Sequence, residues 1–225
     1  TLRVTPVFQF SQKGDPPQAP FPLHYTGGTI QGAGLTLHVK SSEPLLPLPQ
    51  TWENLSYEDD RKDGRRETGL GLICAAVELT VPQGESGQLE LVFSTEPSGK
   101  GGAEILLDAE ARQHSLLAQS GFKDPAAREL ARSADAFIAN RPSSGGKTIL
   151  AGYPFFGDWG RDTMIALPGC VLATKQYETA KSILRTFLAY EQDGLVPNLF
   201  PEGQEEPRYN TVDAALLLIN CVWLY

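Results

Sequence analysis

The pattern of hydrophobic and polar residues changes near the middle of the chain. Up to about Gly121, short runs alternate between apolar and polar residues, and Pro and Gly separate them. This alternation is typical of strands with one buried face. Eight of the 17 prolines lie within the first 49 residues, which disfavours helices there. We predict an antiparallel β-sandwich over residues 1–121, with strands at 2–4, 35–39, 75–81 and 87–93.

From about Phe122 the apolar residues recur with a period near 3.6, which is typical of amphipathic helices. Asp124 followed by Pro125 is a helix start signal, and Pro168 is expected to kink or restart a helix. We therefore predict an all-α part over residues 122–225. Its expected helices are Asp124–Asn140, Thr163–Thr174, Tyr177–Gln192 and Thr211–Tyr225. The last is apolar nearly all round and is expected to be buried.

Composition narrows the function classes. The 225 residues carry a net charge of −8 and are 41% apolar and 20% charged, which suits a globular protein with a core. A negative chain is a poor binder of nucleic acid or anionic lipid, and the apolar run Ala214–Tyr225 is shorter than the ~20 residues of a membrane span. We expect no nucleic-acid or membrane partner.

The three cysteines Cys74, Cys170 and Cys221 are widely spaced and are expected to be buried thiols in a reducing compartment. No signal segment opens the chain, so we expect a cytoplasmic location. The chain begins at Thr1 and stops at Tyr225 inside an apolar stretch, from which we expect a fragment of a longer protein.

The segment Gly145-Gly146-Lys147-Thr148 looks like the end of a phosphate-binding loop, but Arg141 stands where that pattern requires glycine. We interpret it as a flexible loop. All three histidines lie in the first part of the chain, so a metal site is not expected. The candidate functional side chains are therefore carboxylates, arginine and aromatic residues. No cofactor is predicted.

The segment 152–163 is the densest unusual stretch, with four aromatic residues, three glycines, two carboxylates and an arginine. Aromatic faces suit the C–H faces of a sugar ring, and adjacent carboxylate and guanidinium groups suit its hydroxyls. The alternative is that Trp159 belongs to the core while Arg161 and Asp162 form an ordinary helix-capping ion pair.

A second cluster, 207–213, precedes the last predicted helix and ends with Asp213. Its acid at a helix start either interacts favourably with the helix dipole or faces a polar ligand at a cavity mouth.

The motifs at 157–163, 194–198 and 208–214 resemble, in order and spacing, the glucosidase domain of glycogen debranching enzymes, chiefly the bacterial and archaeal amylo-α-1,6-glucosidase type. The segment 52–67 is similar to that family's N-terminal domain. The resemblance implies a β-sandwich (1–121) followed by the first helices of a truncated (α/α)6 toroid (122–225). It also implies inverting hydrolysis of α-1,6-linked glucose stubs on glycogen or limit dextrin, in glycogen catabolism.

In related toroids the Trp-x-Arg-Asp segment holds the terminal glucose, a role that the resemblance carries onto Trp159, Arg161 and Asp162. We further assign substrate binding to Asp158, Tyr209, Asn210 and Asp213. The resemblance places the catalytic acid and base beyond Tyr225, so we expect no hydrolysis by these 225 residues. The alternatives are another toroidal exo-glycosidase, such as a glucoamylase-like or glucosylglycerate-type enzyme, or an inactive glucan-binding fragment.

Overall fold

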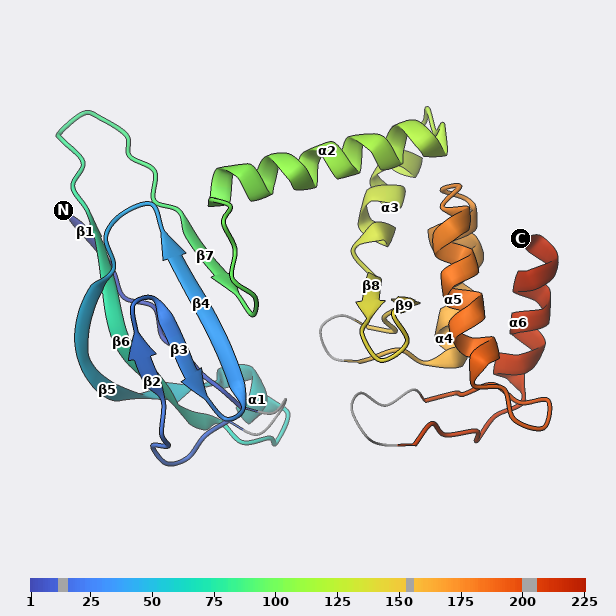
Figure 1. Cartoon of the computed structure of the whole chain (residues 1–225), viewed down its shortest axis with the longest axis horizontal. Helices are drawn as coiled ribbons and strands as arrows, with labels where there is room; N and C mark the ends of the chain where they lie inside the picture. Colours follow the sequence, from blue (N-terminus) through green and yellow to red (C-terminus); the bar gives the residue numbers. More distant parts are fainter. Residues whose placement is uncertain (12–15, 153–155, 200–205) are drawn as a thin grey trace. The chain divides into compact units, whose positions relative to one another are not determined.

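The computed structural model of the chain describes residues 1–11, 16–152, 156–199 and 206–225. Its internal contacts divide it into two compact units, Thr1–Asp108 and Ala109–Tyr225, which are described separately. Figure 1 shows strands in the first unit and mainly helices in the second. The predicted order, antiparallel sheets followed by helices, is confirmed.

The first unit contains two antiparallel sheets, with strand orders β1-β6-β5 and β2-β3-β4-β7. The strands are β1 Leu2–Val4, β2 His24–Thr26, β3 Thr29–Gly32, β4 Leu35–Ser41, β5 Leu46–Ser56, β6 Thr68–Leu79 and β7 Leu91–Ser94. A short charged helix, α1 (Glu58–Lys62), connects β5 to β6. Each of the four predicted strands overlaps one of these, although β7 begins only at Leu91.

Side chains from both sheets form one core. Leu72 and Cys74 of β6 pack with Ile30 of β3 and Val39 of β4, and all four are buried. The strand β5 contains Pro47 and Pro49 and has a register shift against β6 between Pro47 and Thr51. β5 lies at the edge of its sheet and pairs only with β6. The two prolines, which have no N–H group, therefore remove no hydrogen bond to a second neighbouring strand.

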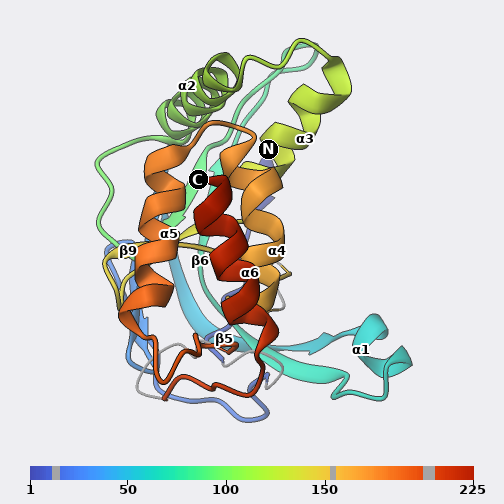
Figure 2. The ribbon, with the colours of Figure 1, turned by 90° about the vertical axis from the view of Figure 1, so that its right-hand side faces the viewer.

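In its described residues the second unit has six helical segments and a β-hairpin, and helix α2 begins before the boundary of the two units. The elements are α2 Gly102–Ser120, α3 Pro125–Asp135, β8 Ile138–Arg141, β9 Gly146–Ile149, α4 Gly160–Leu167, the π-helix η1 Pro168–Leu172, α5 Tyr177–Ala189 and α6 Asp213–Leu224. Figure 2 shows α4, α5 and α6 running alongside one another.

Two predictions about this part were wrong. Residues 102–120 form a helix, although they were assigned to the β part; the run is rich in Ala, Leu, Glu and Gln, which are good helix formers. The helix expected to reach Asn140 ends at Asp135, and residues 138–149 form the antiparallel hairpin β8–β9 instead of a flexible loop. The β-branched residues Ile138, Thr148 and Ile149 favour strands over helix at these positions.

Two local signals were read correctly. The Asp124 carboxylate accepts a hydrogen bond from the Ala127 N–H at 2.9 Å, as an N-cap residue does. Pro168 ends α4 and opens the π-helical turn η1, because it cannot donate to the preceding turn of an α-helix. These two residues set where α3 begins and where α4 ends.

The core of the second unit lies between α4, η1, α5, α6 and the strand β9. Its buried residues are Ile149, Met164, Leu167, Val171, Ala180, Ile183, Leu184, Phe187, Val196, Ala214, Leu218 and Cys221. Helix α5 contributes four of them at helical spacing, which confirms the predicted amphipathic stripe.

Helix α6 differs from its prediction. Only Ala214, Leu218 and Cys221 are buried, whereas Leu216 is 64% exposed and Trp223 is 81% exposed. The expectation of a helix buried on all sides was therefore wrong within the described chain: α6 packs on α4 through one face.

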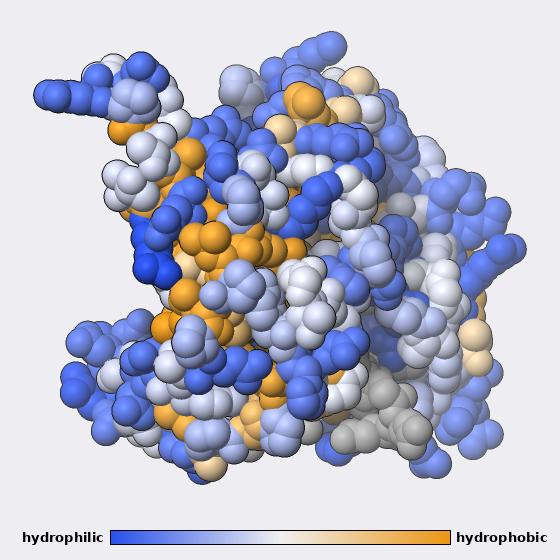
Figure 3. Space-filling model, turned by 60° about the vertical axis from the view of Figure 1, so that its left-hand side comes forward, coloured by the Kyte–Doolittle hydropathy of each residue, from blue (hydrophilic) through white to orange (hydrophobic). Residues whose placement is uncertain are grey.

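Figure 3 shows a face on which hydrophilic residues prevail and hydrophobic residues gather in limited patches. Among the helices that the structure describes, none combines the length and apolar character needed to cross a membrane.

The cysteines provide a test of this packing. All three are free, Cys74 and Cys221 have no exposed surface, and burial raises the pKa of Cys74 from 9.0 to about 11. At pH 8 such a thiol holds about a hundredfold less thiolate, the reactive form. We expect iodoacetamide to modify the half-buried Cys170 first and Cys74 last in the folded chain, and all three at similar rates in guanidinium. Equal rates for Cys74 in both conditions would contradict this packing.

Candidate functional site

The first turns of α4 and α6 lie next to each other. Arg161, in the first turn of α4, donates from Nη1 to the Asp213 carboxylate at 3.2 Å, and Asp213 is the first residue of α6. The two helices share many packing contacts along their length. Two of the residues predicted for substrate binding, separated by 52 positions, are therefore brought together.

A close approach of two backbone segments fixes where α4 begins. The Gly160 N–H donates to the Asn198 carbonyl at 2.7 Å. A Cβ on Gly160 would lie 2.1 Å from the Pro197 carbonyl oxygen, so only glycine fits. Trp159 and Leu199 form an antiparallel bridge beside this contact. Trp159 is thereby held, half-buried, directly before the helix.

Asn198 joins this start to the segment before α6. Its N–H donates to the Arg208 carbonyl at 2.8 Å, and its Nδ2 donates to the Asn210 Oδ1 at 3.2 Å. The side chain is 2% exposed, and its Oδ1 is buried without a hydrogen-bond partner among the described residues. Asn198 belongs to the motif 194–198 but was not predicted as a site residue; its place after the apolar run 195–197 was the one further signal of its position.

The Arg161–Asp213 pair remains open to solvent, with side chains 48% and 42% exposed. The Thr211 hydroxyl, and then the Arg161 guanidinium and the Ala214 N–H, hold the pKa of Asp213 below its usual value. The Thr211 oxygen itself is buried and has no partner at regular hydrogen-bond geometry among the described residues, so the hydroxyl acts on Asp213 as a nearby dipole. Asp213 is therefore ionised at neutral pH and accepts hydrogen bonds.

An open cavity of about 590 Å³ lies beside this carboxylate. It is lined by Leu195 and by residues 209–213, among them the predicted residues Tyr209, Asn210 and Asp213. Small-molecule sites commonly have volumes of about 300–1,000 Å³ and combine apolar walls with a few polar groups. Leu195 was quoted in a motif but was not predicted to line a site.

Tyr209 and Asn210 also hold the cavity wall in place. The Tyr209 hydroxyl donates to the Tyr190 carbonyl at 2.7 Å, and burial raises the pKa of this phenol. Asn210 is exposed and accepts from Asn198, so its own amide nitrogen is left to donate to a ligand. These contacts fix the wall between α5 and α6.

Asp162 lies one residue beyond Arg161, is half-buried and does not line the cavity. No described residue donates a hydrogen bond to its carboxylate, and its position in the first turn of α4 suits a negative charge. Tyr153, Pro154 and Phe155 of the aromatic segment lie outside the described residues, and Phe156 is 60% exposed.

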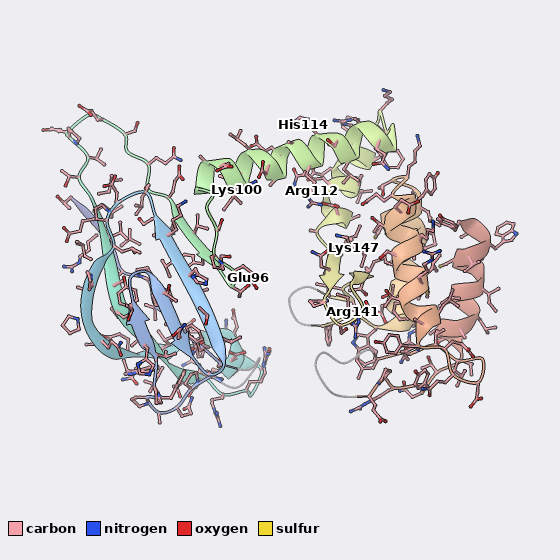
Figure 4. The ribbon with its side chains drawn as sticks, viewed as in Figure 1. Glu96, Lys100, Arg112, His114, Arg141 and Lys147 are labelled. Carbon is pink, nitrogen blue, oxygen red and sulfur yellow. The ribbon has the colours of Figure 1, made fainter. Side chains whose placement is uncertain are left out.

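Asp158 lies apart from these groups, in the interior of the second unit. It is 2% exposed, and its Oδ2 accepts from Arg141 Nη1 at 2.5 Å and from Thr148 Oγ1 at 2.9 Å. The three residues line a separate cavity of about 380 Å³ beside the hairpin, where Figure 4 labels Arg141. Arg141 and Thr148 were not predicted as partners, because nothing in their sequence spacing links them to Asp158.

The Gly160 contact can be tested by a matched pair of glycine substitutions. Gly160→Ala places a methyl group against the Pro197 carbonyl and should lower the free energy of unfolding by about 1–3 kcal/mol. Gly157→Ala has open space around the new methyl group and should stay within about 0.5 kcal/mol of the parent. Urea unfolding of both variants measures the difference; equal values would refute the close approach.

The buried Arg141–Asp158 pair gives a second prediction about stability. Asp158→Ala removes the carboxylate that pairs with the buried Arg141 guanidinium and should cost about 3–5 kcal/mol in urea unfolding. The control is Glu129→Gln, which breaks the exposed Arg132–Glu129 pair and should cost less than about 1 kcal/mol. A small loss for Asp158→Ala would mean that this carboxylate is not needed to hold the hairpin.

Part of the chain is similar to known proteins. The family model for amylo-alpha-1,6-glucosidase matches residues 132–225. The glycogen debranching enzyme of Saccharomyces cerevisiae is 36% identical over 89 residues, which cover 37% of this chain and 6% of the yeast protein. No solved structure matches the chain. The resemblance found in the motifs is thus confirmed: the segment 132–225, which contains α4, α6 and the Arg161–Asp213 pair, matches the model of the amylo-alpha-1,6-glucosidase family.

Proposed function

We propose that this chain supplies the glucose-binding groups of a glycoside hydrolase that removes α-1,6-linked glucose stubs from glycogen or limit dextrin with inversion. The observation that carries the proposal is the ionised Asp213 paired with Arg161 at the mouth of a 590 Å³ cavity, within the matched segment. The chain spans 6% of the yeast relative, so substrate, reaction and cytoplasmic location are all part of the proposal.

The chemistry of the pair suits a neutral sugar. Arg161 offers guanidinium donors and Asp213 offers carboxylate acceptors. Adjacent hydroxyls of a sugar ring can therefore accept from Arg161 and donate to Asp213. The Asp162 carboxylate, which no described residue engages, is a further acceptor, and the ring of Trp159 offers an apolar face. The Tyr209 ring and the Asn210 amide extend the contacts along the cavity.

We assign these acids to binding and not to proton transfer. A general acid at neutral pH needs a raised pKa, whereas the pKa of Asp213 is lowered. An inverting reaction also needs a second carboxyl group about 6.5–9.5 Å from the first, with a water between them. The proposed general acid is therefore a residue other than Asp213, and the resemblance implies that the base also lies elsewhere. We further propose that the helices form part of an (α/α)6 toroid that follows a sandwich domain built from β1 to β7.

Asp158 is the weakest member of the proposed binding set. Its Oδ2 is already used by Arg141 and Thr148, and the cavity that it lines contains neither Arg161 nor Asp213. We propose that Asp158 supports the glucose site indirectly, because the chain passes directly from it to Trp159 and α4.

A binding experiment on the 225-residue chain tests the proposal. Isomaltose, titrated by calorimetry, should bind with a dissociation constant that rises about tenfold in Arg161→Gln and in Asp213→Asn, since each variant loses a charge-assisted hydrogen bond. Glu129→Gln, which lies in another exposed ion pair, should leave binding unchanged.

Maltose as a second ligand distinguishes α-1,6 from α-1,4 preference. Tighter binding of isomaltose supports the debranching assignment, and tighter binding of maltose favours a glucoamylase-like enzyme. Unchanged isomaltose affinity in both Arg161→Gln and Asp213→Asn would overturn the site.

A further inference from the structure

A second polar cavity lies between the hairpin turn and helix α5. It has a volume of about 320 Å³ and is lined by Ser144, Gly145 and Gly146 on one side and by residues of α5 on the other. Strand β9 packs along α5, which holds the turn against the helix. This cavity shares no lining residue with the proposed glucose cavity.

Two cations of α5 face this cavity. Lys181 and Arg185 are four residues apart, so their side chains lie on the same face of the helix. No described residue forms an ion pair or hydrogen bond with the Arg185 guanidinium, which is exposed. Lys181 lies 3.9 Å from Glu178, beyond hydrogen-bond distance, and Glu178 is 87% exposed at the rim. Both cations are therefore available to an anion.

The hydroxyl groups of the cavity are also available as donors. The Ser182 hydroxyl accepts from the Lys147 N–H at 3.0 Å, so its own proton is left to donate. The Ser144 hydroxyl lies 3.4 Å from the Arg141 carbonyl and 3.4 Å from Thr186 Oγ1. Both distances are long for hydrogen bonds, so these contacts are weak. Both hydroxyls can turn toward a ligand that lies between them and the two cations.

Glycines allow the turn to lie this close. A Cβ on Gly146 would lie 2.6 Å from Thr186 Oγ1, and Gly145 has a positive φ of 63°. The Lys147 ammonium points elsewhere and donates to Asn140 Oδ1 at 2.6 Å. Figure 4 labels Lys147 on this hairpin. The segment 145–148 thus forms the end of a hairpin turn and the start of β9, and not the strand–loop–helix of a nucleotide-binding loop.

We propose that this cavity binds a phosphate group, carried by a hexose phosphate or present as inorganic phosphate. Two cations and the Ser182 hydroxyl on α5, together with the Ser144 hydroxyl on the hairpin turn, match the several acceptor oxygens and the charge of near −2 of a phosphate at neutral pH. The chain has a net charge of −8, so its overall field repels anions and binding has to come from these local groups.

Calorimetric titration of the 225-residue chain with inorganic phosphate and with glucose 6-phosphate, at low salt and pH 7.5, tests the site. Arg185→Gln should weaken binding by at least about tenfold, because one charge-assisted hydrogen bond is lost. Glu178→Gln should tighten binding, because it removes the negative charge at the rim. Lys123→Gln, an exposed cation outside the cavity, is the matched control and should bind as the parent does.

The two phosphate sources are separated by their affinities: tighter glucose 6-phosphate identifies a sugar phosphate as ligand, and equal affinities identify the phosphate group alone. Unchanged binding in Arg185→Gln, or an equal loss in Lys123→Gln, would overturn the site. Because isomaltose should not compete with phosphate, a failure here and a failure of the glucose site give different results.

Discussion

The junction at Asn198 is the contact on which the candidate site depends. Its carbonyl accepts from Gly160, its N–H donates to Arg208, and its side chain donates to Asn210. One residue thereby connects the start of α4 to the segment that precedes α6. The absence of a side chain at Gly160 is the steric condition for this junction, because a methyl group would overlap the Pro197 carbonyl.

Two Arg–Asp pairs in the same unit serve different purposes because their surroundings differ. Arg141 and Asp158 are both less than one-tenth exposed, and the Asp158 carboxylate is satisfied by Arg141 and Thr148. Burying such a pair costs desolvation free energy, so the pair adds little net stability. Removing one partner is nevertheless strongly destabilising, because the other charge stays buried. Arg161 and Asp213 are nearly half exposed, so their mutual attraction is weak and a ligand can replace it at little cost. The exposed pair is therefore the better partner for a sugar.

The sequence predicted those features that local chemistry decides. The stripe of α5, the Asp124 cap and the Pro168 break were all readable, since each depends on residues within a few positions. The β8–β9 hairpin was missed because its stability comes from packing on α5, a contact between residues about 35 positions apart. Likewise, 157–163 contains both Asp158 and Asp162, and only the fold separates a buried carboxylate from an accessible one.

Helix α5 shows how one periodic pattern can generate two properties at once. Its inward residues Ile183 and Phe187 have no exposed surface and hold the core, so the residues on the opposite side of the helix point outward. Lys181 and Arg185, four positions apart, lie on one face of the helix away from the core, and the hairpin turn places the Ser144 hydroxyl against the same face. The apolar stripe that predicts the helix therefore also fixes where its cations lie. What turns an ordinary charged face into a cavity is the turn at Gly145 and Gly146, a tertiary contact that periodicity alone does not reveal.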